Sequence, residues 1–524
     1  MKHTHFICKR AALAVTLVLL LSSVTVASGG SASIRVGYTF NDDTGSMAVN
    51  QPTYNTYEGL GLSLSDVHYR WDNGTYLTAD LRNITMNNRN VRAWIGKPGR
   101  FSLSATNDQY RRVYDWSGGD FTRRRNTSVQ GMYQPSRYFK FFGGYGRTDK
   151  HGTTSFFLPA LSDSIVSRGD WSQTRYNVGG QVGDKHGLVK VEYRRFDITD
   201  HTAMAADRKA DQVDVTATSA VPGFRQIFLA GGLNYRKDII ETSITELSTN
   251  QYWGAGKFYF TPTLLLDYRL VFATTKRNSP SQEIDNLQNT VTLAKSWGRW
   301  GGIRAGYESR IIDDILSRTI SNGVLTNVWA RPTSRLYLSG LFATRKADAE
   351  TSLTVLGDEN RTRGGATIRY SHPDWGTIGA RWEGRFRRNN ELNSSVDYNV
   401  ASGDLNLERA RYGRLSVSYS YYMGTYENRS DVTSYKFRDH VLSGHVYPVA
   451  YRNLTFDAGG TWYRSRRDQD IEKFNLDFGA SYRFPKGHRL EVRYNVFNYD
   501  DYHFIDKYYT ANIVEISFIK DVQF

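Results

Sequence analysis

Apolar and polar residues alternate along many stretches of this chain. The stretch 413–421 reads GRLSVSYSY, so that Leu, Val and Tyr occupy one set of alternate positions while Arg and Ser occupy the other. The stretches 378–387, 473–484 and 489–496 follow the same pattern. Because successive side chains of a β-strand point to opposite faces, the pattern predicts strands with one apolar and one polar face. A soluble sandwich also alternates, but these apolar faces repeatedly end in Tyr, Trp and Phe, which favours contact with lipid.

Short turns separate the predicted strands. Twelve of them are found, at 72–74, 97–99, 134–137, 183–187, 221–223, 261–263, 297–301, 331–334, 372–376, 410–413, 448–453 and 485–488. Thirteen connections, mostly longer and more polar, lie between and around them, such as 43–57, 148–171 and 347–360. Together they predict 26 strands, an even number with both termini at the short-turn end, as in single-chain bacterial barrels. The same parity would also fit 22 or 24 strands.

Proline positions agree with this division of the chain. Eight of the eleven prolines fall in the short turns, whereas Pro52, Pro159 and Pro280 fall in long connections. None interrupts a predicted strand, where it would remove a ladder hydrogen-bond donor. We therefore predict an all-β fold, a transmembrane antiparallel up-and-down β-barrel of about 26 strands (range 22–26).

The first 29 residues have the features of a secretory signal peptide. Three cations precede an apolar run at 11–21, and small residues at 27–29 offer a cleavage site. The apolar run is too short to favour a membrane helix. We expect residues 1–29 to be removed and residues 30–524 to form a single barrel domain. Because the first predicted strand, 33–40, follows at once, we expect no plug domain and no periplasmic domain.

Composition agrees with a secreted barrel. The only cysteine is Cys8, inside the predicted signal, so the mature chain has no disulfide. Aromatic residues make up 14% of the chain although its mean hydropathy is −0.53, which suits strands with one face in lipid and the other in water. The formal net charge is +15, but the cations are dispersed along strands. Without a recognisable binding motif, we expect no nucleic-acid partner.

The last predicted strand carries a candidate assembly signal. Its alternating apolar face consists of Val514, Ile516, Phe518, Val522 and Phe524. Lys520 interrupts this face. Such a strand resembles the terminal signal that outer-membrane barrels present to the barrel assembly machinery. We therefore expect the protein in the bacterial outer membrane, with lipid and the assembly machinery as partners.

A barrel of this size is wide. Strands about 4.8 Å apart, tilted by roughly 40°, give a 26-stranded barrel a radius of about 25 Å. Large barrels normally contain a plug. Because we expect no plug here, we predict a partner in the lumen. An elongated cross-section with loops folded inward is the alternative.

The polar faces supply the predicted lumen-lining residues. They are Arg269, Arg304, Arg381, Arg385, Arg414, Arg489 and Arg493, together with Asp267, Glu192, Glu308, Glu383, Glu491 and Glu515. In the simpler interpretation, these residues face a wet interior and pair across strands. In the functional interpretation, they form an electrostatic lining for a passenger or a solute.

In its layout the chain resembles the MtrB/PioB family of porins. The features in common are the mature start, the strand count, the missing plug and hairpin sequences such as FSLSATNDQYRRVYDWSGGDF at 101–121. The resemblance implies a scaffold that sheaths a periplasmic multihaem cytochrome and carries electrons across the outer membrane. It would place haem in the partner and no cofactor in this chain. An early CxxC, found in some members, is missing here.

The sequence also bears on three other classes of outer-membrane barrel. The alternative function is a diffusion porin, either general or selective for anions or oligosaccharides. A TonB-type receptor is disfavoured because we expect no plug. A lipopolysaccharide-export barrel is disfavoured because we expect no periplasmic domain and the mature chain has no cysteines.

The sequence offers no catalytic or metal-binding motif. It contains no CxxCH and no HExxH, and its eleven histidines are scattered. His440 and His445 are five residues apart on one predicted strand, so we expect them on opposite faces rather than as joint ligands. No nucleophile–base pair stands out, and we therefore expect a protein that is not an enzyme.

Overall fold

The computed structural model consists of antiparallel strands. It describes residues 29–45, 55–113, 121–157, 164–184, 186–202, 207–221, 224, 226–241, 245–278, 280–314, 317–349, 359–390, 393–428, 433–504 and 507–523. Apart from Gly29, the predicted signal peptide lies outside the described residues, and so does Phe524 of the predicted assembly signal. In the described part of the chain, no helix is long and apolar enough to cross a membrane.

The described strands number 27. In chain order they are β1 (Gly30–Gly45), β2 (Gly59–Arg70), β3 (Tyr76–Arg82), β4 (Asn90–Lys97), β5 (Phe101–Val113), β6 (Phe121–Tyr133), β7 (Phe139–Phe157), β8 (Ser164–Arg168), β9 (Trp171–Gly183), β10 (Gly187–Asp200), β11 (Arg208–Ala220), β12 (Ile227–Ile240), β13 (Thr245–Thr261), β14 (Leu264–Asn278), β15 (Ser281–Ser296), β16 (Gly301–Asp314), β17 (Ser317–Ala330), β18 (Leu336–Ala349), β19 (Glu359–His372), β20 (Gly376–Asn389), β21 (Ser394–Arg409), β22 (Gly413–Asn428), β23 (Thr433–Pro448), β24 (Leu454–Arg467), β25 (Ile471–Arg483), β26 (His488–Asp501) and β27 (Tyr508–Gln523). Two short 3₁₀ turns, Gly298–Trp300 and Pro485–Gly487, join β15 to β16 and β25 to β26.

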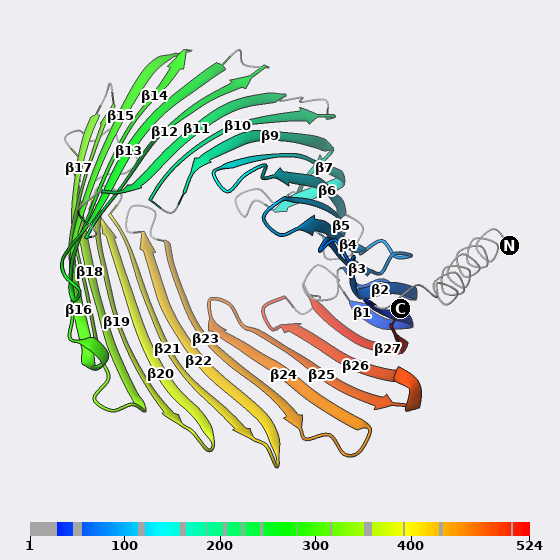
Figure 1. Cartoon of the computed structure of the whole chain (residues 1–524). Helices are drawn as coiled ribbons and strands as arrows, with labels where there is room; N and C mark the ends of the chain where they lie inside the picture. Colours follow the sequence, from blue (N-terminus) through cyan, green and yellow to red (C-terminus); the bar gives the residue numbers. More distant parts are fainter. Residues whose placement is uncertain are drawn as a thin grey trace.

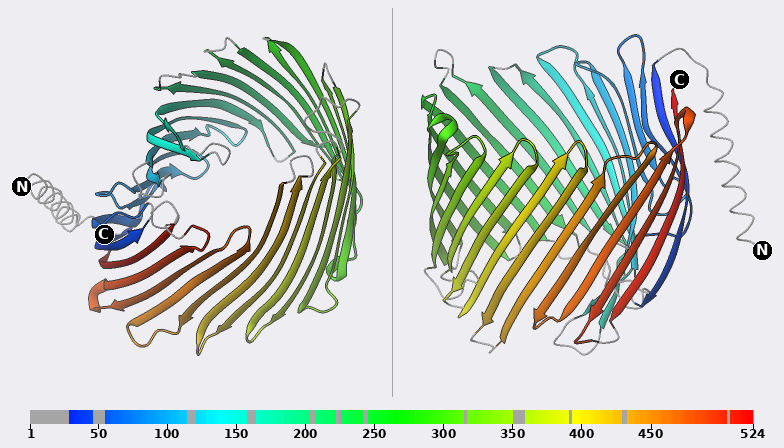
Figure 2. Two further views of the ribbon diagram at one scale, coloured as in Figure 1. Left: turned by 180° about the vertical axis from the view of Figure 1, so that it is seen from behind. Right: turned by 90° about the horizontal axis from the view of Figure 1, so that it is seen from below.

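The strands close into one ring, as Figure 1 shows along the barrel axis. Each wall strand pairs with its neighbour in the chain, and β1 pairs with β27 from Ser31↔Gln523 to Gly45↔Tyr509. Among the described strands, β8 pairs with the end of β7 alone, and β7 continues the wall by pairing with β9. The wall therefore contains 26 strands, which confirms the predicted number. Figure 2 shows from the side that the strands are tilted, as closure requires.

Strand register keeps apolar residues together on one face of the wall. Val36 and Tyr38 of β1 pair with Phe518 and Ile516 of β27. In turn, Ile516 pairs with Val492 of β26. These side chains are exposed in the isolated chain. An exposed apolar band around a closed barrel is the surface that a bilayer covers.

The short turns lie where the sequence predicts them. All twelve join consecutive wall strands, and each contains a proline or a glycine, residues that favour turns. In the turn after β4, Arg100 N donates to Lys97 O at 3.0 Å, and Gly99 has a φ of +67°. Pro98 before this glycine gives the sequence of a type II turn, in which the third residue needs a positive φ.

Two connections differ from the predicted pattern. The predicted loop 148–171 contains the end of β7 and β8, which pair as a hairpin. The connection 83–89, between the short strands β3 and β4, folds back on β2. There Ile84 N donates to Leu62 O at 2.8 Å, and Thr85 Oγ1 donates to Leu60 O at 2.7 Å. This connection therefore supplies partners to β2 where β3 has ended.

Candidate functional site

The polar face of the wall is the concave, inner face. Pairs of polar side chains on this face meet across an intervening strand. Arg35 of β1 lies 3.6 Å from Glu491 of β26, across β27. Arg493 of β26 lies 3.7 Å from Asp457 of β24, across β25. Side chains converge in this way on the inside of a curved sheet and spread apart on its outside. The polar face therefore lines the lumen.

Six arginines and three glutamates form a dense group on the inner face of β16 and β18–β20, which we name the arginine cluster. Its members are Arg345, Arg361, Arg363, Arg381, Arg385 and Arg387, with Glu308, Glu359 and Glu383.

Glu383 is the centre of the arginine cluster. Its carboxylate lies 2.6 Å from Arg381, 2.6 Å from Arg385 and 3.0 Å from Arg363. Glu359 similarly pairs with Arg361 and with Arg387, the latter at 2.7 Å.

The arginine cluster presents positive charge to the lumen. The side chains of Glu359 and Glu383 are only 7% and 8% exposed, whereas those of Arg381 and Arg385 are both 59% exposed. The carboxylates thus lie beneath the guanidinium groups and orient them. Since the arginines outnumber the glutamates, positive charge remains uncompensated at the surface that a solute would meet.

A recess of about 760 Å³ opens beside the arginine cluster. Arg345, Arg361 and Arg385 line it, as does Tyr398 of β21. The Arg385 guanidinium lies 5.9 Å from the centre of the Tyr398 ring. The recess therefore combines several cationic donors with an aromatic surface, a suitable environment for an anionic group attached to an apolar or ring-shaped body.

The structure brings together some of the predicted lumen residues. Arg381, Arg385, Glu308 and Glu383 belong to the arginine cluster. Glu491 and Glu515 meet Arg35 where β1 closes on β27, and Arg489 pairs with Glu491. Glu192 binds Lys190 and Arg194 on β10. Arg414 pairs with Glu408 at 2.8 Å, and both side chains are well exposed. Among the described residues, Arg269, Arg304 and Asp267 have no ion pair.

Sequence reasoning did not name Arg345, Glu359, Arg361, Arg363 or Arg387 as lumen-lining residues. Outward positions on β19 include Asn360 and Thr362, so both faces of that stretch are polar. Alternation between apolar and polar residues therefore gives no signal there. The pairing of β19 with β20 identifies the face, because Arg363 lies opposite Arg385.

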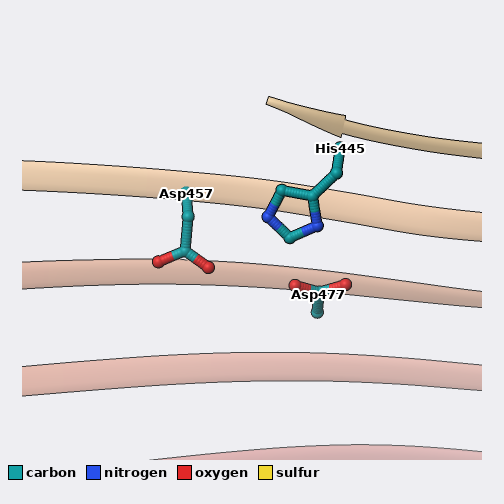
Figure 3. A group of neighbouring side chains, drawn as sticks. All are labelled: His445, Asp457 and Asp477. Atoms are coloured by element: carbon teal, nitrogen blue, oxygen red, sulfur yellow. The ribbon is translucent and has the colours of Figure 1, made fainter. Parts of the chain in front are cut away.

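A second group on the inner face contains His445, Asp457 and Asp477, from β23, β24 and β25. One potential ligand atom from each residue lies within 4.8 Å of the others. Figure 3 shows the imidazole and both carboxylates directed into the same space. As predicted, His440 lies on the opposite face, where its Nδ1 is 2.8 Å from the Tyr419 hydroxyl. The sequence pattern did not predict this group.

The predicted assembly signal forms one face of β27. Val514, Ile516, Phe518 and Val522 pair with Phe40, Tyr38, Val36 and Ala32 of β1. Lys520 lies on the same face, opposite Ile34. The face is thus part of the seam that closes the barrel. Recognition by the assembly machinery stays a prediction.

No family model and no curated protein matches the sequence. Among solved structures, the chain is similar to the FrpB iron transporter from Neisseria meningitidis, with a TM-score of 0.50 and 7% identity over 95% of this chain and 82% of that chain. It is also similar to the siderophore receptor PirA from Pseudomonas aeruginosa (0.49, 10% identity, 95% and 81%) and to the ferric yersiniabactin uptake receptor FyuA from Yersinia pestis (0.47, 10% identity, 95% and 80%). At these identities the likeness concerns the fold alone.

The fold and its lipid-facing band define the class of protein. The chain is a closed 26-stranded β-barrel of the bacterial outer membrane, and it resembles the barrels of TonB-dependent receptors. None of the comparisons supports the MtrB/PioB family.

These comparisons correct the predicted fold class. The antiparallel barrel of 26 strands is retained, but its assignment to a class without a plug is wrong, because the similar solved structures are TonB-dependent receptors, which have a plug domain. Alternation and turn spacing describe only the wall, and a wall of given strand number has the same two faces whether or not a domain fills it. A TonB-type receptor was disfavoured only by the expected absence of a plug, and it is therefore no longer disfavoured.

Proposed function

We propose that this chain is a transport barrel that takes an anionic solute across the outer membrane, with the arginine cluster as the site that selects it. The observation that carries the proposal is the layering of the cluster. Half-exposed guanidinium groups cover nearly buried carboxylates, so the inner wall offers preformed cationic donors. Arginine-lined constrictions are a common basis of anion selectivity in pores.

The chemistry of the recess defines the class of solute. Guanidinium groups match carboxylates and phosphates by donating two parallel hydrogen bonds. Tyr398 adds a ring against which an apolar or sugar ring can pack. We therefore expect an anionic oligosaccharide or another carboxylate- or phosphate-bearing solute with a ring, bound and passed without a catalysed reaction.

The cytochrome sheath implied by the MtrB/PioB resemblance is a different function. The comparisons do not support it. The iron and siderophore substrates named for the similar solved structures do not carry over either, because identities of 7–10% concern the fold. The arginine cluster is the feature of this chain that favours transport of an anionic solute over these other functions.

The test is the ion selectivity of the refolded chain in a planar bilayer under a KCl gradient. We expect an anion-selective reversal potential that shifts towards zero in Arg363→Gln/Arg385→Gln. The matched control is Arg195→Gln, because Arg195 lies on the outward face, paired with Asp197 at 3.1 Å. A cation-selective wild type, or an equal shift in the control, would overturn the proposal.

A further inference from the structure

The second group on the inner face is organised around a glycine. His445 of β23 pairs with Gly459 of β24, and Gly459 pairs with Asp477 of β25, so the three residues form one row across the sheet. The backbones of His445 and Asp477 are then roughly 10 Å apart, twice the spacing between strands. Their side chains meet only because the residue between them has none.

Gly459 is necessary for this approach. A Cβ atom on Gly459 would lie 2.5 Å from His445 Nδ1 and 2.7 Å from Asp477 Oδ1. Both distances are shorter than van der Waals contact, so a side chain here would force the two groups apart. The glycine therefore leaves a hollow that is bounded by one nitrogen and one oxygen donor.

Asp457 supplies a third donor to the same hollow. It lies two residues before Gly459 on β24, and hence on the same face. Its partner across the strands is also a glycine, Gly479, and an Asp457 carboxylate oxygen occupies the space that a Cβ of Gly479 would take. Figure 3 shows the resulting arrangement of one imidazole and two carboxylates.

The imidazole of His445 is held in place but has an unused nitrogen. Its ring stacks on Tyr447, with centroids 4.1 Å apart. Nε2 is shielded from solvent and has no hydrogen-bond partner among the described residues. Burying a polar atom without a partner is unfavourable. A cation coordinated by the imidazole would offset part of this cost.

The two carboxylates have little cationic compensation. Arg493 Nη2 lies 3.7 Å from Asp457 Oδ2, beyond the distance of a direct hydrogen bond. In the part of the chain that the structure describes, Asp477 has no hydrogen bond or ion pair. Glu383, by contrast, contacts three arginines. The hollow thus has excess negative charge beside the His445 imidazole, whose Nδ1 borders it.

We propose that His445, Asp457 and Asp477 bind a divalent transition-metal cation such as Zn²⁺. One imidazole nitrogen with two carboxylate oxygens is a donor set that suits Zn²⁺, Mn²⁺ or Fe²⁺, whereas Ca²⁺ and Mg²⁺ favour oxygen donors alone. Three protein ligands leave coordination positions open for water or a passing solute. The site stands apart from the arginine cluster, and its existence does not depend on anion transport.

Cobalt provides a direct probe of the proposed site. The full chain, refolded in detergent and freed of metal by a chelator, is titrated with Co²⁺ and followed by visible absorption, and then by displacement with Zn²⁺. We expect one equivalent of Co²⁺ to give a ligand-field band. Since loss of an outer-shell partner already costs about 10–100-fold in affinity, His445→Ala and Asp477→Asn should each weaken binding at least that much.

Three further variants make the result specific. His440→Ala removes a histidine from the outward face of the same strand and should leave binding unchanged. Gly459→Ala keeps all three ligands but fills the hollow, and should abolish the band. Arg493→Gln removes the neighbouring cation and should strengthen binding.

Folding of every variant is checked by the heat-dependent shift in gel mobility that folded barrels undergo. If folded His445→Ala and Gly459→Ala bind Co²⁺ like the wild type, or if the wild type gives no band, the proposal is wrong. A loss in His440→Ala equal to that in His445→Ala would contradict it as well.

Discussion

The arginine cluster and the His445–Asp457–Asp477 site lie on the same inner face, but their carboxylates differ in how far cations compensate their charge. In the cluster, Glu383 is nearly buried under three arginines, so its charge is satisfied within the protein. At the second site, two carboxylates face an imidazole, and glycines replace the side chains between them. Alternation of apolar and polar residues therefore determines only which face of the wall is polar. The residues between the charges decide whether a region attracts anions or cations.

The largest expected effect tests the wall that both regions share. Val417→Arg places a charge on the outward face of β22, one residue from Ser416, which pairs with His445. We expect the free energy of unfolding in lipid to fall by about 2–4 kcal/mol if this position lies near the bilayer midplane. Urea titration of the reconstituted protein measures it.

The matched control for Val417→Arg is Ser418→Arg, which adds the same charge one residue further along, on the inner face. Stability close to that of the wild type is expected, because the inner face is wet. If Ser418→Arg were the more damaging of the two, the assignment of faces for both regions would be reversed.

A smaller effect is expected within the arginine cluster. Glu383→Gln leaves Arg363, Arg381 and Arg385 without their common partner. We expect a loss of about 1–2 kcal/mol in the free energy of unfolding, moderated because the arginines are half-exposed. Glu408→Gln is the control, since its pair with Arg414 is well exposed and should contribute less than about 0.5 kcal/mol. Equal losses in the two variants would mean that burial under the arginines has no energetic consequence.

The smallest effect should have the opposite sign. Without metal, Asp477→Asn removes one of two carboxylates whose oxygens lie within 4.8 Å of the same imidazole nitrogen. We expect the free energy of unfolding to rise by about 1 kcal/mol or less in the presence of a chelator, because the repulsion between the two carboxylates is removed. The same urea titration with Zn²⁺ added should reverse the order and favour the wild type. If Asp477→Asn with chelator present lost as much free energy of unfolding as Glu383→Gln, the two regions would not differ in how they stabilise their carboxylates.

The sequence predicts the wall better than it predicts the lumen. Proline and glycine act locally, so all twelve turns and the 26-stranded wall could be predicted. Connection 83–89 could not, because its hydrogen bonds to β2 depend on where β3 ends. Five of the nine members of the arginine cluster were not predicted, and three of them lie on β19, where Asn360 and Thr362 make both faces polar. The His445–Asp457–Asp477 site could not be predicted either, because it depends on the register of three strands. That register places Gly459 between His445 and Asp477.

The inference about the plug failed for a related reason. Whatever fills a barrel contacts its inner face, and that face is polar in empty and in filled barrels alike. A wall sequence therefore contains little information about the occupant. The arginine cluster and the His445–Asp457–Asp477 site say more about what enters the lumen. Each is a specific arrangement of charges that a merely wet surface does not require.

The most direct measurement of the central claim is the accessibility of single cysteines along β22. The one cysteine, Cys8, lies in the predicted signal, so the mature chain offers a cysteine-free background. Residues 415–420 are replaced one at a time, and the reconstituted barrel is exposed to a membrane-impermeant thiol reagent. A closed barrel with a wet interior predicts labelling at Ser416, Ser418 and Ser420 and protection at Leu415, Val417 and Tyr419. Uniform labelling, or labelling in the opposite phase, would contradict it.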